Sequence, residues 1–144
     1  SMGYGIPAAV AMKRIHPDRP VVAVAGDGDF LMSGQEMAAA VQYGLPMVII
    51  VADNSLYGTI RMHQERDFPG RVSATELVNP DFAAYAHAFG GFGVTVERTA
   101  DFPAAFRAAE ASGLPAIVHL KISPDAILPG TTLTAIREKA LAGR

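Results

Sequence analysis

"VVAVAGDGDF", residues 21–30, is an apolar run that ends abruptly in Gly-Asp-Gly. Val21–Ala25 is short, continuous and rich in β-branched residues, which is typical of a strand buried on both faces. A second run of this kind, Met47–Ala52, follows after a stretch with helical spacing. Because buried strands separated by a helix form βαβ units, these runs predict a parallel sheet covered by helices on both faces.

The rest of the chain continues this alternation. Ser33 and Glu36 have the spacing of a capping box, and Asn79 before Pro80 has that of an N-cap, so a helix is expected to begin at each. Asp53–Gly70 is expected to be a loop with a short helix. The fold class predicted is α/β, a doubly wound and mostly parallel sheet, as a single domain over residues 1–144. The other expected elements are strands Phe92–Val96 and Pro115–Ile122, and helices Gly3–Ile15, Glu36–Tyr43, Pro80–Phe89, Thr99–Ser112 and Leu133–Ala142.

Composition excludes several classes of function. The net charge is −2 and 18% of residues are charged, so there is no basic surface for nucleic acid. The chain has no cysteine, which excludes disulfides and thiolate chemistry and suits a cytoplasmic location. The longest apolar run is far too short to span a bilayer. We therefore expect neither a nucleic-acid nor a membrane partner.

Two polar residues stand where the predicted strands end. Asp27 follows the first strand, and Asn54 follows the second, 27 residues later. Parallel neighbouring strands bring such residues to one edge of the sheet, where a carboxylate and an amide oxygen suit Mg²⁺. The bare backbone of Gly26 and Gly28 would let a phosphate approach. Each motif alone is more often a simple turn, but the combination predicts a metal and phosphate site.

The segment Gly26–Gly58 begins with Gly-Asp-Gly and reaches Asn54 after about two dozen residues. It resembles the cofactor signature of thiamine-diphosphate-dependent enzymes. "SMGYGIPAAVA" (1–11) and "NPDFAAYAHAFGGFG" (79–93) are similar to segments of acetolactate synthases and their decarboxylase relatives. The resemblance covers nearly the whole chain and identifies it as the C-terminal, diphosphate-binding domain of such an enzyme.

The resemblance implies roles for individual residues. Asp27 and Asn54 would bind Mg²⁺ through side-chain oxygens, and Leu56 through its backbone carbonyl. Met2 would wedge beneath the cofactor and force its bent shape. The full set implied to bind cofactor is Met2, Gly26, Asp27, Gly28, Asp29, Asn54, Leu56, Tyr57 and Gly58.

The same resemblance implies that Thr59, Ile60 and His63 line the substrate. His63 departs from the Trp of plant-type acetolactate synthases. Two arginines of the same segment, Arg61 and Arg66, could meet a substrate carboxylate, but we expect them to be solvated loop charges. His119 is expected to be a satisfied residue of the core or the sheet end. No catalytic residue is expected in this chain, since the glutamate that activates the cofactor would come from another domain.

The implied activity is decarboxylation of a 2-oxo acid, with pyruvate expected, and addition of the carbanion to a second carbonyl. Thiamine diphosphate and Mg²⁺ are the expected cofactors, and any FAD would lie in another domain. The expected partners are a pyrimidine-binding domain of the same or a partner chain and further copies in a dimer or tetramer. This chain is expected to be a piece of a larger enzyme and inactive alone.

Two alternatives remain open at this point. The first is a 2-oxo acid decarboxylase of the benzoylformate or indolepyruvate type. The second is a non-catalytic cofactor-binding module or subunit. A dinucleotide-binding Rossmann domain fits poorly, because no Gly-x-Gly-x-x-Gly follows the first strand.

Overall fold

A computed structural model describes residues 1–143. The chain divides into two compact units. The first combines Ser1–Asp53 with Asn79–Lys121, and the second combines Asn54–Val78 with the chain from Ile122 onward. The expectation that residues 1–144 act as one diphosphate-binding domain stays a prediction.

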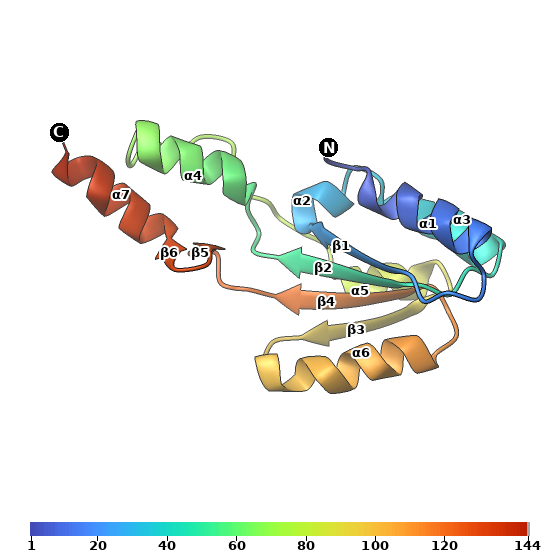
Figure 1. The fold of residues 1–144 in the computed structure, drawn as a ribbon. Coiled ribbons are helices and arrows are strands. Elements are labelled where there is room, and N and C mark those ends of the chain that lie inside the picture. The colour runs from blue at the N-terminus through green and yellow to red at the C-terminus, as the bar shows by residue number, and fades with distance from the viewer. Residues whose placement is uncertain (144) are drawn as a thin grey trace. The chain divides into compact units, whose positions relative to one another are not determined.

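The first unit is built on a four-stranded parallel sheet in the order β1-β2-β4-β3 (Figure 1). Val24, Ile50, Val118 and Val94 lie side by side across it. Because every strand runs in the same direction, the residues that follow their carboxyl ends meet at one edge. The strands are β1 (Val22–Gly26), β2 (Val48–Asp53), β3 (Phe92–Val96) and β4 (Ala116–Lys121).

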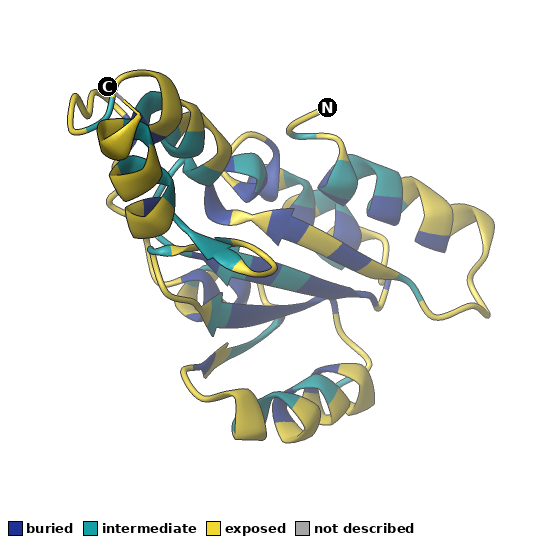
Figure 2. Ribbon diagram, turned by 60° about the vertical axis from the view of Figure 1, so that its left-hand side comes forward, coloured by how far each residue is buried: buried dark blue, intermediate teal, exposed yellow. Residues whose placement is uncertain are grey.

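Helices cover both faces of this sheet, as expected for a doubly wound fold. On one face, α1 (Gly5–Ile15), α3 (Met37–Gln42) and α5 (Phe82–Ala88) pack their apolar side chains on the strands. On the other face, α6 (Phe102–Ala111) packs on β2, β3 and β4. The middle strands, β2 and β4, are the most buried (Figure 2). The prediction that the first strand is buried on both faces is wrong, because β1 lies at the edge of the sheet and Val22 and Val24 are 46% and 68% exposed. The predicted α/β class and parallel sheet are confirmed.

The second unit pairs two helices of ten residues each, α4 (Gly58–Asp67) and α7 (Leu133–Ala142). It also contains a small antiparallel hairpin of β5 (Ala126–Leu128) and β6 (Thr131–Thr132), which the sequence did not suggest. The expectation of a loop with only a short helix underestimated α4. The apolar pattern of α4 is weak, and its one fully buried side chain among the described residues is that of Glu65, which forms ion pairs with Arg61 and with Arg137 of α7.

Two predicted helix starts are wrong. The Ser33–Glu36 capping box does not form, and Ser33 Oγ is buried without a hydrogen-bond partner among residues 1–143. The chain instead forms a 3₁₀ helix, Gly34–Glu36, before α3. It passes close to the ring of Phe30 there, since a Cβ at Gly34 would lie 2.6 Å from that ring. A one-turn helix, α2 (Asp27–Phe30), precedes this segment, and another 3₁₀ helix, Thr99–Asp101, leads into α6.

The N-cap of α5 is Asp81 rather than Asn79. Asp81 Oδ1 accepts hydrogen bonds from the backbone N–H groups of Ala83 and Ala84, at 2.9 and 3.1 Å. The helix therefore begins at Phe82, and Asn79 makes no capping contact. Its side chain is used elsewhere.

Candidate functional site

The carboxyl edge of the parallel sheet carries a buried polar cluster. Asp27 follows the last residue of β1, and Asp53 ends β2. His119 lies in the neighbouring strand β4, opposite Val51 of β2. The exposed fractions of Asp27, Asp53 and His119 are 2%, 2% and 1%. Buried polar groups must be hydrogen-bonded or lose free energy, so the partners of these three side chains define the site.

Asn79 joins the two carboxylates. Its Nδ2 donates to Asp27 Oδ2 and to Asp53 Oδ1, each at 2.7 Å. One amide nitrogen carries two protons, so both bonds form together. The other oxygen of Asp53 contacts His119 Nε2 at 2.8 Å and Lys121 Nζ at 2.6 Å. A continuous chain of polar contacts thus runs from β1 to β4.

The surroundings of Asp27 disfavour its ionised form. Burial raises its pKa above the ordinary value, and the neighbouring Asp53 carboxyl adds to this effect. Hydrogen bonds from Asn79 and from the Gly28 N–H, 2.9 Å from Asp27 Oδ1, lower the pKa but do not cancel the rise. A carboxylate placed in this way gains free energy from a bound cation.

Asp29 ties the start of the chain to this edge. Its Oδ1 accepts a hydrogen bond from the Gly3 N–H at 2.5 Å, which places the neighbouring Met2. Met2 is 49% exposed, so its side chain is accessible. Gly26, with φ −72°, has no heavy atom within 4 Å of a Cβ built on it. Its backbone therefore faces open space.

In the second unit, Asn54 opens a tight turn. Its Oδ1 accepts from the Leu56 N–H at 3.2 Å, and Ser55 between them has φ +56°. Leu56 stands opposite Glu76 in an antiparallel bridge, whose hydrogen bonds run from Tyr57 to Thr75 and from Leu77 to Ser55. In such a pair the carbonyl of Leu56 points away from Glu76.

Gly58 begins α4 under a steric constraint. A Cβ there would lie 2.9 Å from Ile127 Cδ1 and 3.1 Å from Asn54 Nδ2, so only glycine fits without displacing the Asn54 amide. Tyr57, at the N-cap, makes no side-chain capping bond, which leaves the first N–H groups of α4 without that partner.

The substrate-lining candidates share one exposed face of α4. Thr59 and Ile60 are neighbours in the first turn, His63 follows about one helical turn later, and all three are exposed. The interpretation of Arg61 as a solvated loop charge is wrong, because it lies in α4 with its side chain 13% exposed and bonds to Glu65 at 2.9 Å.

The predicted site residues divide between the two units. Met2, Gly26, Asp27, Gly28 and Asp29 belong to the first. Those of the second are Asn54, Leu56, Tyr57, Gly58, Thr59, Ile60 and His63. The expected meeting of Asp27 with Asn54 stays a prediction. Among residues 1–143, no group of three or more His, Asp or Glu side chains forms a metal site by itself.

Sequence reasoning missed Asn79 and undervalued Asp53. Asn79 looked like a cap because Pro80 follows it, although Asp81 offers an equally good capping side chain two residues later. The acid at Asp53, at the end of an apolar strand, was the signal that a buried partner was needed. His119 is buried and its Nε2 contacts Asp53, but its Nδ1 has no hydrogen-bond partner among the described residues, so the expectation of a satisfied histidine holds for one ring nitrogen only.

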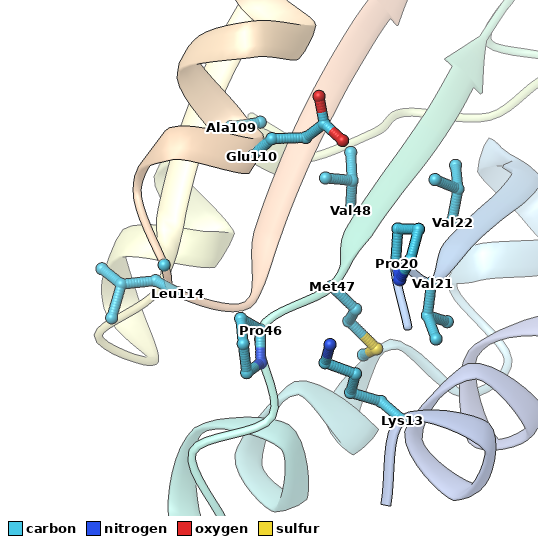
Figure 3. Close-up of a pocket in the computed structure, with 11 residues that line it drawn as sticks. Lys13, Pro20, Val21, Val22, Pro46, Met47, Val48, Ala109, Glu110 and Leu114 are labelled. Carbon is cyan, nitrogen blue, oxygen red and sulfur yellow. The ribbon is translucent and has the colours of Figure 1, made fainter. Parts of the chain in front are cut away.

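A groove of about 230 Å³ lies at the opposite, amino ends of the strands, between the starts of β1 and β2 and the end of α6 (Figure 3). Its lining is mainly apolar, as at Met47 and Leu114. Lys13, which also lines the groove, donates hydrogen bonds to the carbonyls of Pro17 and Arg19, both at 2.8 Å. No helix within residues 1–143 is long and apolar enough to cross a membrane.

Comparison with known proteins agrees with this arrangement. An acetolactate synthase large subunit from Haemophilus influenzae is 41% identical over 97 residues, 67% of this chain and 17% of the relative. The isozyme 2 large subunit from Escherichia coli is 34% identical over 145 aligned residues, 96% of this chain and 26% of the relative. The chain therefore spans about a quarter or less of the length of these curated relatives.

Solved structures show the same fold. A thiamine diphosphate-dependent 4-hydroxybenzoylformate decarboxylase from Rhodococcus jostii superimposes with a TM-score of 0.79 at 31% identity, over 85% of this chain and 23% of the other. A family model described as thiamine pyrophosphate enzyme, C-terminal TPP binding domain, matches residues 1–120. This chain belongs to the family of thiamine-pyrophosphate-dependent enzymes, as a C-terminal cofactor-binding domain of the acetolactate synthase-like kind.

Proposed function

We propose that this chain binds Mg²⁺ and, through it, the diphosphate of thiamine diphosphate, in an acetolactate synthase-like enzyme that acts on 2-oxo acids. One observation carries the proposal. Asp27 is a buried carboxylate at the carboxyl end of a parallel strand, with a raised pKa and, within residues 1–143, no cationic side chain among its hydrogen-bond partners. A metal ion would supply the missing positive charge.

The donor set suits a hard cation. Asp27 offers a carboxylate oxygen, Asn54 an amide oxygen and Leu56 a backbone carbonyl, all oxygen ligands of the type Mg²⁺ prefers. Mg²⁺ commonly completes its shell with water and phosphate oxygens. The bridge to Glu76 supports a role for Leu56, because it turns the Leu56 carbonyl away from the paired segment.

The features around Asp27 and Asn54 support a diphosphate. Gly26 leaves open space beside its backbone, and Gly58 accepts no Cβ without disturbing Asn54. We propose that Gly28, Asp29, Tyr57 and Gly58 contact the phosphates.

Met2, fixed through Gly3 by Asp29, is in our proposal the residue that supports the bent cofactor. When bound, the cofactor supplies a carbanion that attacks the 2-oxo acid and accepts electrons as carbon dioxide leaves. The residues of this chain would bind and orient it, and Thr59, Ile60 and His63 would border the substrate.

The activity of the whole enzyme depends on parts outside this chain. We propose that a pyrimidine-binding domain, in the same or a partner chain, supplies the activating glutamate within a homo-oligomer, and that this chain alone does not turn over substrate. Pyruvate is the proposed substrate. FAD, if the enzyme holds it, would bind elsewhere.

A decarboxylase that joins no second carbonyl is the alternative. It is favoured by the likeness to the Rhodococcus jostii 4-hydroxybenzoylformate decarboxylase, whose TM-score is 0.79. Product analysis with pyruvate and with benzoylformate separates the two: acetolactate indicates the synthase, and benzaldehyde indicates the decarboxylase. A module without catalysis would give neither product in the intact protein.

Calorimetric titration with thiamine diphosphate tests the binding proposal. The intact protein is titrated with and without Mg²⁺, beside Asp27→Ala and beside Asp101→Ala, which removes an exposed carboxylate of the first unit. We expect Mg²⁺-dependent binding that is lost in Asp27→Ala and kept in Asp101→Ala. Binding of equal strength in Asp27→Ala would contradict the proposal.

A further inference from the structure

The chain passes between its two units at three places: after Asp53, before Asn79 and after Lys121. Asp53 accepts hydrogen bonds from the other two residues, from Asn79 Nδ2 at 2.7 Å and from Lys121 Nζ at 2.6 Å. The three residues of the first unit at which the chain crosses to or from the second are therefore held together by one buried carboxylate, that of Asp53.

Asn79 extends this anchor to Asp27. Its Nδ2 donates a second bond to Asp27 Oδ2, across 52 residues of sequence, while the Gly28 N–H donates to Oδ1. Both oxygens of Asp27 are thus oriented by a donor. Because each carboxylate oxygen has two lone pairs, each can still face a metal ion.

Few side chains could replace Asn79 here. Two buried carboxylates repel each other, and a neutral group with two protons on one atom attracts both without adding charge. A hydroxyl has a single proton, and an ammonium would compete with a bound cation.

The orientation of the amide is fixed by the same electrostatics. Asn79 Oδ1 is buried and has no hydrogen-bond partner in the part of the chain that the structure describes. Flipping the amide would exchange Nδ2 and Oδ1, so that the oxygen would face the carboxylates of Asp27 and Asp53. Leaving Oδ1 unpaired costs free energy, and this cost is offset by keeping Nδ2 between Asp27 and Asp53.

We infer that Asn79 is a positioning residue: anchored on Asp53, it holds the carboxylate of Asp27 in the orientation that binds Mg²⁺. The inference rests on the proposed function, in which Asp27 is a metal ligand. Asn54, the second proposed ligand, directly follows Asp53. The contacts of Asp53 with Asn79 and Lys121 therefore also fix the point at which the chain leaves the sheet before Asn54.

The test measures metal affinity rather than turnover. Mn²⁺ replaces Mg²⁺, and electron paramagnetic resonance of free Mn²⁺ reports its binding to the intact protein with thiamine diphosphate. We expect Asn79→Ala to weaken Mn²⁺ binding by about 10- to 100-fold, as partners of metal ligands commonly do. Asn79→Ser, with a single proton to donate, is expected to be intermediate.

Asp81→Ala is the matched control. It removes the N-cap of α5, two residues from Asn79, and is expected to lower stability without removing a hydrogen bond of Asp27. We expect its Mn²⁺ affinity to stay within about twofold of the wild type. Thermal unfolding of each variant separates lost stability from lost positioning, and Asn79→Ser serves if Asn79→Ala does not fold.

The outcomes distinguish the two proposals. Wild-type protein that binds no Mn²⁺ would overturn the proposed function, and this inference with it. Wild-type binding with unchanged affinity in Asn79→Ala, or in Asn79→Ser if that variant is the one that folds, overturns the inference alone. Equal losses in the Asn79 variant and in Asp81→Ala would also overturn it, because they would show an effect of stability.

Discussion

Arg137 and Glu65, 72 residues apart, form a two-point ion pair that joins α7 to α4. Arg137 Nε lies 2.7 Å from Glu65 Oε2, and Nη2 contacts Oε1. The Arg61 Nε–H and the Gly70 N–H complete the shell at 2.9 and 3.1 Å. Glu65 is fully buried, so this carboxylate is the main polar link within the second unit.

This arrangement predicts a loss of stability in acid. The hydrogen bonds of Arg137 lower the pKa of Glu65 from 4.5 to about 2. The unfolded chain therefore binds the proton more readily, and the stabilisation is complete above pH 4.5 and is lost as the pH falls toward 2. Arg137 is 38% exposed, and solvent screening limits the contribution to about 1–3 kcal/mol.

Glu65→Gln should remove that contribution. At pH 6 we expect lower amide protection in α4 and α7 than in the wild type, and a difference that shrinks by pH 3. Hydrogen exchange measured by mass spectrometry at both values checks this. Asp101→Asn, which breaks the exposed pair with Arg98, is the control and should change neither helix. Equal protection in Glu65→Gln and wild type at pH 6 would refute the prediction.

Gly26→Ala should separate binding from folding. With φ −72° and no heavy atom within 4 Å of the added Cβ, alanine fits the backbone, and thermal stability should change by less than about 0.5 kcal/mol. Binding of thiamine diphosphate should weaken, because the methyl group occupies the proposed phosphate approach. Calorimetry compares it with Gly5→Ala, whose Cβ would make an ordinary 3.9 Å contact. Full cofactor affinity in Gly26→Ala would place the phosphates elsewhere.

Gly58→Ala tests the second proposed ligand. The added methyl group, 3.1 Å from Asn54 Nδ2, should displace that amide and weaken Mg²⁺-dependent binding by about 10-fold. Arg66→Ala, an exposed substitution in the same helix, is the control. The prediction fails if both variants bind thiamine diphosphate as the wild type does.

Gly93→Ala tests the packing of α5 on β3. A Cβ at Gly93 would lie 2.1 Å from the carbonyl oxygen of Ala83, and backbone cannot move aside as a flexible side chain can. We expect destabilisation of about 3 kcal/mol by urea unfolding. Thr95→Ala, at an exposed position of the same strand, should cost less than about 1 kcal/mol. Similar costs at the two positions would show that this close approach is not maintained.

The sequence alone determined the sheet. The runs around Ile49 and Ile117 are apolar over whole strands, and a parallel sheet covered on both faces buries such runs. The run of β1 is of the same kind, but β1 lies at the edge of the sheet, where Val22 and Val24 remain exposed. Gly-Asp-Gly after the run of β1 and Asn54 after that of β2 also marked the polar ends of these strands correctly, because a strand end is set by local chemistry.

Only the tertiary structure decided the partners of the polar residues. Asn79 bonds to Asp27 across 52 residues and to Asp53 across 26, and Glu65 pairs with Arg137 across 72. The local sequence predicted that Asn79 is a helix N-cap and that Ser33 forms a capping box, because the hydrogen bonds of both motifs join residues at most about four positions apart. Burial favoured the distant contacts over the local ones, because a carboxylate removed from water needs hydrogen-bond donors, and packing of the chain decides which donors lie near it.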